Sequence, residues 1–410
     1  MDFESTRSIV NKLASDIPPH LFGEARHVFI GKYLDEQPDE IKMGIKTHLD
    51  GLLDRMRKLE ASDIDFGGPG CAKRIWFRVF GNKKPEMNLK DYSLDETDVI
   101  INNIITSTER EKLLTQRNLD FSYRVFDEEN KTWARFRATI YFELNHLALN
   151  MRRINEQIIP FREFGFHDDV AKALSLKYQK SGLILVTGIT GSGKSTTLDS
   201  IIDANNRTMS SHIIIIADPV EYVHESIKAI VKHREIGRDV HSFKEGTIQA
   251  LRQDPDIIVI GEMRDAETIM TVLEVVDSGH KVFSTLHTSS ALESIDRILG
   301  EISPDEQDRI RERLADVLTA VISQKLIPSL DGRLVLAKEV LLTNSSIKTA
   351  IRNNNIGEVY QIIQQSNAGG MNTMEQDLAR LNSTNTISYF EAYINANNKK
   401  RFEELVKYSY

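Results

Sequence analysis

The stretch of sequence that decides the fold is Leu183-Ile-Leu-Val186-Thr-Gly188-Ile-Thr-Gly-Ser-Gly-Lys-Ser195-Thr196. Its apolar start, Leu183–Val186, predicts a buried β-strand, and Gly188–Ser195 fits the P-loop pattern G-x4-G-K-[ST]. A helix is expected to begin near Ser195. Because the backbone N–H groups of such a loop curl around an anion and the helix N-terminus adds partial positive charge, the stretch predicts a nucleotide-phosphate site.

The side chains at the end of this loop have expected roles of their own. Lys194 should reach the β- and γ-phosphates, and Ser195 should ligate Mg²⁺. The alternative is an ordinary glycine-rich turn, which the preceding strand and the following helix disfavour. No guanine-reading N-K-x-D sequence follows at a later strand end. ATP is therefore the expected nucleotide and Mg²⁺ the expected metal.

Around the loop, short apolar strands alternate with helical segments. The expected strands are Leu183–Val186, His212–Ala217, Ile257–Ile260 and Lys281–Thr285. Strands without a polar alternation are buried on both faces, which is typical of a parallel sheet covered by helices. The sequence therefore predicts an α/β core.

Acidic residues follow two of these strands. Asp218 and Glu221 come after the strand that ends at Ala217, and Glu262 comes after the strand that ends at Ile260. ATP hydrolysis needs carboxylates that hold Mg²⁺ and orient the attacking water. The alternative use of an acid after a strand is as a helix N-cap. Two such acids downstream of a P-loop in one sheet favour catalysis.

A histidine follows a third strand of the same sheet. His287 comes directly after the strand Lys281–Thr285 and Leu286. At that edge it can sense or donate to the γ-phosphate, and a structural role is the open alternative.

Composition limits the class of protein. The chain has 410 residues, 52 of them basic and 60 acidic, for a net charge of −8. That length predicts two or three domains, and the acidic balance disfavours a protein that coats nucleic acid. One cysteine, Cys71, allows no internal disulfide and no cysteine-based zinc cluster, which fits a reducing cytoplasm. We expect neither a signal peptide nor a membrane span.

The rest of the chain divides by pattern. Residues 1–58 are expected to be helical, either as a layer against the next domain or a neighbouring subunit, or as solvated helices. From Ser62 to Arg153, alternating runs surround a helical stretch near residues 95–117, which predicts an α+β domain with an antiparallel sheet. A connector with Pro160 and Gly165 leads into the core. After residue 304 the chain is expected to be mostly helical, with one strand-like run, Leu334–Leu342.

The motifs taken together resemble the type II/IV secretion and pilus ATPase superfamily, and within it the pilus-retraction, or twitching-motility, ATPase family (PilT). Four boxes carry the resemblance: Gly188–Thr196 as Walker A, Asp218–Glu225 as the aspartate box, Arg252–Asp265 as the Walker B region, and Ser278–Thr288 as the histidine box. Four shorter stretches are also similar to the family: Ala61–Ile64, Ala134–Arg137, Thr349–Asn353 and Gly370–Met374.

Three features depart from the family pattern. Ala217 stands where the aspartate box usually has a glutamate, and Asn354-Asn355 stand where retraction ATPases prefer Leu-Ile. The first 58 residues have no counterpart that we can place. Extension and secretion members typically carry a tetracysteine zinc module, which a single cysteine excludes here.

The resemblance implies a RecA-like P-loop core preceded by a PAS-like α+β domain and an extra N-terminal helical segment. The implied divisions are a helical extension (1–58), a PAS-like domain (59–158), a hinge linker (159–170), an ATPase core (171–303) and a mainly helical C-terminal subdomain (304–410). It also implies a homo-hexamer that docks on an inner-membrane pilus platform protein at the cytoplasmic face, without inserting in the membrane and without binding nucleic acid.

The resemblance also implies roles for residues of the site. Glu221 would polarise the attacking water, Glu262 and Ser195 would hold Mg²⁺, and His287 would sense the γ-phosphate. The nucleotide contacts would be Gly188, Thr190, Gly191, Ser192, Gly193, Lys194, Ser195, Thr196 and Asp218. The candidates for an arginine finger are Arg135, Arg137 and Arg152, whose alternative role is as solvent-facing positions on an edge strand.

The expected function is that of a hexameric ATP-hydrolysing motor that powers type IV pilus retraction by closing and opening its N-terminal domain on the ATPase core. A secretion or conjugation ATPase of the same superfamily is one alternative. A RecA-like nucleic-acid motor is a second, and the acidic charge disfavours it. The third is a nucleotide-binding scaffold without hydrolysis, which Ala217 keeps open.

Overall fold

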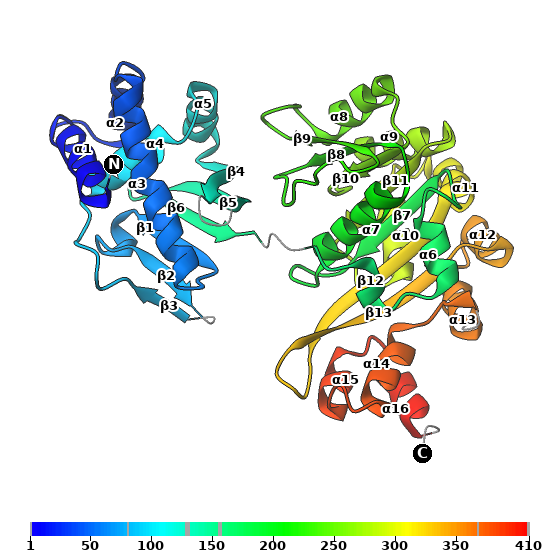
Figure 1. Cartoon of the computed structure of the whole chain (residues 1–410). Coiled ribbons are helices and arrows are strands. Elements are labelled where there is room, and N and C mark those ends of the chain that lie inside the picture. Colours follow the sequence, from blue (N-terminus) through cyan, green and yellow to red (C-terminus); the bar gives the residue numbers. More distant parts are fainter. Residues whose placement is uncertain (1, 80–81, 128–131, 155–157, 367–368, 408–410) are drawn as a thin grey trace. The chain divides into compact units, whose positions relative to one another are not determined.

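A computed structural model describes residues 2–79, 82–127, 132–154, 158–366 and 369–407. Contacts divide the chain into two compact units, residues 1–156 and 157–410. Figure 1 shows the elements of both. Each unit is described by itself.

The first unit is built on a six-stranded sheet in the order β3-β2-β1-β6-β5-β4, in which every neighbouring pair is antiparallel. This confirms the predicted antiparallel α+β domain. Alternate residues face the core, as the pattern predicts: Phe136 and Ala138 are buried on β5, whereas Arg137 between them is exposed. The strands are β1 (Asp63–Gly67), β2 (Trp76–Val79), β3 (Asn82–Pro85), β4 (Asn118–Asp127), β5 (Thr132–Glu143) and β6 (His146–Arg153).

Helices of the first unit share one hydrophobic core with the sheet. The helices are α1 (Phe3–Ser15), α2 (Gly23–Asp35), α3 (Asp39–Lys58), α4 (Leu94–Asn103) and α5 (Ser107–Gln116), with a short 3-10 turn at Pro69–Cys71. Three of these helices, α1, α2 and α3, lie between residues 3 and 58, where a helical segment was expected. Val10 of α1 and Leu49 of α3 are fully buried in the same cluster as Ile64 and Phe136 of the sheet. The first three helices are therefore a layer packed on this unit, and the expected stretch near 95–117 is two helices.

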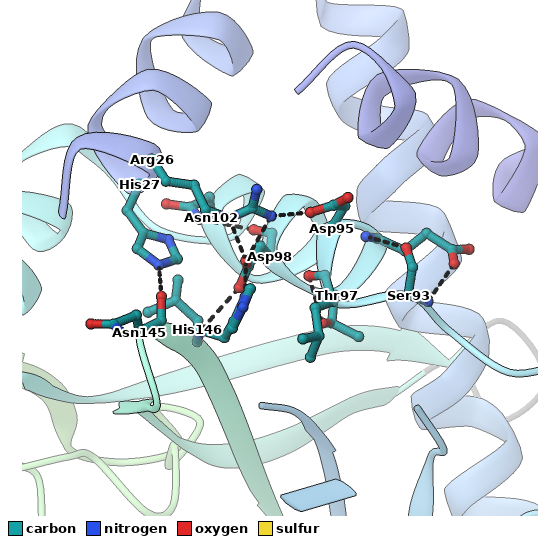
Figure 2. Close-up of polar contacts among 12 residues, drawn as sticks. Arg26, His27, Ser93, Asp95, Thr97, Asp98, Asn102, Asn145 and His146 are labelled. Atoms are coloured by element: carbon teal, nitrogen blue, oxygen red, sulfur yellow. Dashed lines mark hydrogen bonds and ion pairs between the residues drawn. The ribbon is translucent and has the colours of Figure 1, made fainter. Parts of the chain in front are cut away.

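A buried polar network ties α2 to α4 and to the start of β6 (Figure 2). The side chain of Asp98 in α4 is fully buried. It accepts hydrogen bonds from Arg26 Nη2 at 3.0 Å and from the backbone N–H of Leu147 at 2.9 Å, and it lies 3.0 Å from His146 Nδ1. His27 Nε2 contacts the backbone oxygen of Asn145 at 3.0 Å. A buried carboxylate with this many partners is satisfied, and it fixes how the three elements pack.

The second unit is built on a seven-stranded sheet in the order β13-β12-β7-β11-β10-β8-β9. All neighbouring pairs are parallel except β12 and β13. The strands are β7 (Gly182–Thr187), β8 (His212–Ala217), β9 (Ile230–Glu235), β10 (Ile257–Ile260), β11 (Lys281–Leu286), β12 (Leu318–Pro328) and β13 (Leu334–Leu342). The four strands predicted for the α/β core are all present.

Both faces of this sheet are covered, which explains why its strands are apolar throughout. Leu183 and Leu185 of β7 belong to one hydrophobic core, and Ile184 and Val186 belong to the other. Residues of α6 and α7 line one core, and residues of α9–α13 line the other. The helices are α6 (Asp168–Leu174), α7 (Lys194–Thr208), α8 (Phe243–Ala250), α9 (Ala266–Asp277), α10 (Ala291–Gly300), α11 (Gln307–Val317), α12 (Ser345–Arg352), α13 (Ile356–Gln365), α14 (Met374–Ser383), α15 (Tyr389–Asn395) and α16 (Lys399–Lys407).

Two strands of the second unit, β9 and β12, were not expected from the sequence. β12 lies in the segment after residue 304 that was predicted to be mostly helical, and it pairs with β7 directly beside the P-loop. The core that contains Leu183 also contains Leu314 and Val321. The finer predicted boundaries, at 58/59, 158/159, 170/171 and 303/304, stay predictions. No helix of the described residues is long and apolar enough to cross a membrane.

A buried carboxylate joins the N-termini of two helices in the second unit. Glu339 of β13 accepts hydrogen bonds from the backbone N–H of Ala291 in α10 at 2.7 Å and of Met374 in α14 at 3.4 Å. Burial raises the pKa of Glu339 from 4.5 to about 7, and the charge of nearby Glu375 adds to this. The proton on Glu339 is therefore bound more tightly in the folded chain than in the unfolded chain.

The Glu339→Gln protein is expected to lose part of the pH dependence of stability. In the wild-type chain, the contribution of Glu339 to the free energy of unfolding should fall as the pH rises from 4.5 to about 7, because the unfolded chain releases this proton first. The slope from one such group is at most about 1.4 kcal/mol per pH unit. Thermal unfolding of both proteins over this range, followed by circular dichroism, measures the difference. Equal pH slopes for the two proteins would contradict the expectation.

Candidate functional site

The P-loop is a turn between β7 and α7 that only glycine can form at its key positions. Gly188, Gly191 and Gly193 have φ angles of 152°, 81° and 84°. A Cβ added at Gly188 would lie 2.3 Å from Ser192 Oγ and 2.6 Å from the backbone oxygen of Gln324, so a side chain there would clash. A Cβ at Gly191 would meet nothing within 4 Å. The loop is therefore tightly supported at its base and open at its middle, as an anion cradle requires.

Lys194 and Ser195 are the first two residues of α7, where the predicted helix begins. The Nζ of Lys194 donates to the backbone oxygens of Gly188 at 2.8 Å and Ile189 at 3.2 Å, so the lysine closes over its own loop. Burial lowers the pKa of Lys194, while the charges of Glu221 and Glu262 act to raise it. The ammonium group therefore lies within the field of both predicted catalytic acids.

The acids and the histidine lie at one edge of the sheet because four neighbouring strands end there. The sheet order places β7, β11, β10 and β8 side by side, all parallel. Their carboxyl ends carry the P-loop, His287, Glu262 and the loop with Glu221. His287 Nε2 lies 3.8 Å from Glu262 Oε2. Burial and the charge of Lys194 lower the pKa of His287, which favours its neutral form.

Asp218 and Glu221 follow β8 in a loop without regular secondary structure. Asp218 is exposed and precedes Pro219 through a cis peptide bond. Glu221 is half-buried. The alternative role of acids after strands, helix capping, applies to a different residue: Asp265 accepts a hydrogen bond from the backbone N–H of Thr268 at the start of α9. The structure assigns no capping role to Glu262.

Two residues of the site were missed by the sequence analysis. The Nε of Arg264 lies 2.6 Å from Glu262 Oε2, so this arginine pairs with the predicted metal-shell acid. Gln324 of β12 is almost fully buried, and its Nε2 donates to the backbone oxygen of Ser192 at 2.7 Å. The preceding residue, Ser323, bonds through its Oγ with Thr187 Oγ1 at 2.8 Å. No short motif marks Ser323 and Gln324, which contact the P-loop strand and the P-loop from β12. The pairing of β12 with β7 in the sheet is what places them there.

The candidate arginine fingers lie in the first unit. The cross-strand register aligns Arg137 of β5 with Arg152 of β6, and Arg152 with Asp63 of β1, on the exposed face of the sheet. Arg135 precedes Arg137 by two residues and shares this face. The alternative was that these arginines are solvent-facing positions on an edge strand. It is wrong in one respect, because β5 and β6 are internal strands of the sheet. Asp63 Oδ1 accepts from Arg152 Nε at 2.9 Å, so Arg152 already has a carboxylate partner in its own unit.

The donor set fits Mg²⁺ bound together with a nucleotide. The loop offers the Ser195 hydroxyl, and the neighbouring strand end offers Glu262, whose side chain is 13% exposed. In the described part of the chain, no cluster of three or more histidine, cysteine, aspartate or glutamate side chains could hold a metal ion by itself. Mg²⁺ is commonly held by one or two protein oxygens plus substrate phosphates, so this sparse set matches it.

A parallel sheet with a P-loop at one strand end and acids at the neighbouring ends defines the class: the chain is a P-loop ATPase. Residues 135–368 match the family model described as "Type II/IV secretion system protein". The chain belongs to the type II/IV secretion system protein family, which confirms the resemblance found in the sequence.

Relatives agree with this family over most of their length. The chain is 36% identical over 330 residues to the twitching motility protein of Neisseria gonorrhoeae, which covers 80% of this chain and 85% of the relative. It is 36% identical over 311 residues to the type IV pilus retraction ATPase PilT of Pseudomonas aeruginosa, which covers 76% of this chain and 88% of the relative.

Solved structures agree with the fold of both units. The pilus retraction motor PilT with bound ADP matches with a TM-score of 0.78 at 36% identity, over 87% of this chain and 98% of that chain. The Legionella pneumophila ATPase DotB matches with a TM-score of 0.68 at 27% identity, over 85% of this chain and 95% of that chain. These matches bear out the RecA-like core and the PAS-like N-terminal domain, and they support nucleotide binding by this chain.

Proposed function

We propose that the chain is the ATP-hydrolysing motor that powers retraction of type IV pili. The observation that carries the proposal is the alignment of the P-loop, Glu221, Glu262 and His287 at neighbouring strand ends of one parallel sheet. The similarity to a pilus-retraction ATPase over most of both chains supports pilus retraction as the process that ATP hydrolysis powers.

The proposed chemistry follows from what each residue presents. The backbone N–H groups of Gly188–Gly193 and the ammonium group of Lys194 hold the phosphates. The Ser195 hydroxyl and Glu262 would hold Mg²⁺, which supplies positive charge against the β- and γ-phosphates when bound. Three exposed residues are further proposed nucleotide contacts: Thr190, Thr196 and Asp218.

Glu221 and His287 are proposed to act on the reacting end of the nucleotide. Glu221 accepts a hydrogen bond from the attacking water and so orients it and increases its nucleophilicity. A neutral His287 can donate one hydrogen bond to the γ-phosphate and report its presence. An arginine on the exposed sheet face of the first unit, Arg135, Arg137 or Arg152, would stabilise charge on the transferred phosphoryl group. Because Arg152 is paired with Asp63, Arg135 and Arg137 are the preferred candidates.

The proposed assembly and cycle convert hydrolysis into movement. Six copies form a ring, and the first unit closes on the ATPase core when ATP binds and opens after hydrolysis. The proposed hinge lies in the connector with Pro160 and Gly165, and Gly165 has a φ of 59°. The ring would dock on a platform protein of the inner membrane, on its cytoplasmic face. No nucleic acid partner is proposed.

A second candidate function is that of a secretion or conjugation ATPase. The match to the type II secretion system protein E of Xanthomonas campestris, 38% identical over 175 residues, favours it. The twitching and retraction proteins match over longer stretches, 330 and 311 residues, at 36% identity. Genes for pilins beside this gene would favour retraction, and genes for a translocation channel would favour export.

A deletion strain tests the proposed function. Without the chain, cells are expected to keep surface pili that no longer shorten and to lose twitching motility. A plasmid copy of the wild-type gene should restore motility, and a Lys194→Ala copy should not, because the phosphates lose their main side-chain cation. A Lys172→Ala copy is the matched control, since Lys172 forms an exposed ion pair with Asp169 on α6. Normal motility of the deletion strain would reject retraction.

A further inference from the structure

The loop that carries Glu221 is tied to the helix that begins at the P-loop. Residues 218–229 connect β8 to β9 and contain neither helix nor strand. No sheet ladder holds this loop, and its end is fixed by the backbone N–H groups of Lys228 and Ala229, which donate to the backbone oxygen of Asn206 in α7. Side chains of α7, the helix that begins with Lys194 and Ser195, hold it at two points.

The first tie is made by a buried histidine. His224 Nε2 contacts Asp199 Oδ1 at 3.0 Å, and the side chain of His224 is fully buried. A carboxylate oxygen only accepts, so Nε2 carries the proton and donates. His224 Nδ1 has no hydrogen-bond partner among the described residues. A second proton there would be a buried donor without an acceptor.

The second tie is made by a buried amide further along α7. Asn206 Nδ2 donates to the backbone oxygen of Glu225 at 2.7 Å, and Asn206 Oδ1 accepts from the backbone N–H of Ile227 at 3.0 Å. The backbone N–H of His224 is also satisfied, because it donates to His233 Nε2 of β9 at 3.0 Å. The part of the loop just after Glu221 therefore has its backbone partners supplied by side chains.

The two ties place the catalytic loop and the phosphate site on one rigid element. Asp199 lies four residues after Ser195, one turn along the same face of α7. His224 lies three residues after Glu221. A shift of the loop away from α7 would move Glu221 relative to Lys194 and Ser195. A displacement of about 1 Å at a catalytic group can cost about 100-fold in rate.

We infer that His224 is a positioning residue of the ATPase site: through Asp199 it holds the loop so that Glu221 stays aligned with the phosphates bound at the start of α7. This inference rests on the proposed function, because it concerns the hydrolysis step. His224 itself touches neither the nucleotide nor the water. Its removal should therefore lower kcat and leave nucleotide affinity nearly unchanged.

The test compares variants of the full-length chain in steady-state ATPase assays and in ADP-binding titrations. The His224→Ala protein should lose about tenfold or more in kcat, with the ADP dissociation constant and the thermal midpoint little changed. The His224→Gln protein should recover most of the rate, because the glutamine amide can donate to Asp199 and carries no charge. The Asp199→Ala protein should resemble His224→Ala, and the double variant should lose no more than either single variant.

The matched control is Asp203→Asn on the same helix. Asp203 lies one turn beyond Asp199 and accepts from Arg207 Nε at 2.7 Å, so the change removes an ion pair of α7 and leaves both ties to the loop, at Asp199 and Asn206, in place. Its kcat should equal that of the wild-type chain. If His224→Ala does not fold, Asp199→Ala carries the same test, since Asp199 lies partly exposed on the helix surface.

Three outcomes would overturn the inference. Wild-type kcat in both His224→Ala and Asp199→Ala would show that the tie does not affect hydrolysis. Equal losses of kcat in His224→Ala and His224→Gln would show that the hydrogen bond to Asp199 is not the cause. Additive losses in the double variant would show that the two residues act separately. A wild-type chain without ATPase activity would instead contradict the proposed function itself, and the inference with it.

Discussion

The Glu221→Gln protein is expected to hydrolyse ATP about 10² to 10⁴ times more slowly than the wild-type chain while still binding the nucleotide. Glutamine keeps the size of the side chain and can still contact the water, but its amide is a far weaker base than a carboxylate. The phosphate contacts come from the P-loop and Lys194, which the change leaves in place. ADP affinity should therefore stay near the wild-type value, and steady-state hydrolysis and ADP titration measure the two quantities.

The matched control for this prediction is Glu225→Gln. Glu225 lies four residues further along the same loop with an exposed side chain, and its backbone oxygen accepts a hydrogen bond from Asn206 Nδ2. The same isosteric change there should leave kcat unchanged. Equal turnover by the Glu221→Gln and wild-type proteins would remove Glu221 from the mechanism.

The Asp98→Ala protein is expected to lose about 3 to 5 kcal/mol of stability in the first unit, because it removes the buried carboxylate that pairs with the buried Arg26. The Arg26 side chain is only 7% exposed, and its Nε and Nη2 both donate to Asp98 Oδ2. The backbone N–H of Leu147 would also lose its acceptor. Figure 2 shows this network between α2, α4 and the start of β6.

Tryptophan fluorescence in urea can measure this loss separately from the second unit. The sequence contains two tryptophans, Trp76 and Trp133, and both lie in the first unit. Asp95→Ala is the matched control, since Asp95 also pairs with Arg26 but its side chain is 45% exposed. That change should cost about 1 kcal/mol or less. Equal losses for the two variants would contradict the assignment of Asp98 as the central acceptor.

Much of the second unit could be predicted from the sequence because its signals are local. The P-loop spacing and the four apolar runs before Gly188, Asp218, Gly261 and His287 each lie within a few residues. β12 could not be found in this way. Leu318, Val321, Ile322 and Leu326 recur at helical spacing, and the segment forms a strand because β7 and β13 are available to pair with it.

Supporting contacts at the site and in the first unit could not be predicted from the sequence, for a related reason. Gln324 acts on the P-loop from 132 residues away in the chain, and Asp98 joins Arg26 from 72 residues away. Neither residue type has a fixed spacing to its partner, so no pattern marks the pair. Arg264 lies next to the predicted Walker B acid, and an arginine two residues after Glu262 is the one local signal that could have suggested it.

The sequence alone determined which backbone and side-chain groups can hold a nucleotide, because phosphate binding depends on a short run with fixed spacing, Gly188–Ser195. It also determined that acidic residues follow the strands that end at Ala217 and Ile260. Only the tertiary structure decided that β7, β11, β10 and β8 lie side by side, which brings those groups to one edge. It alone decided that His224 reaches Asp199 and that the first three helices share a core with the antiparallel sheet. Contacts between distant segments depend on how elements pack, and packing is a property of the whole chain.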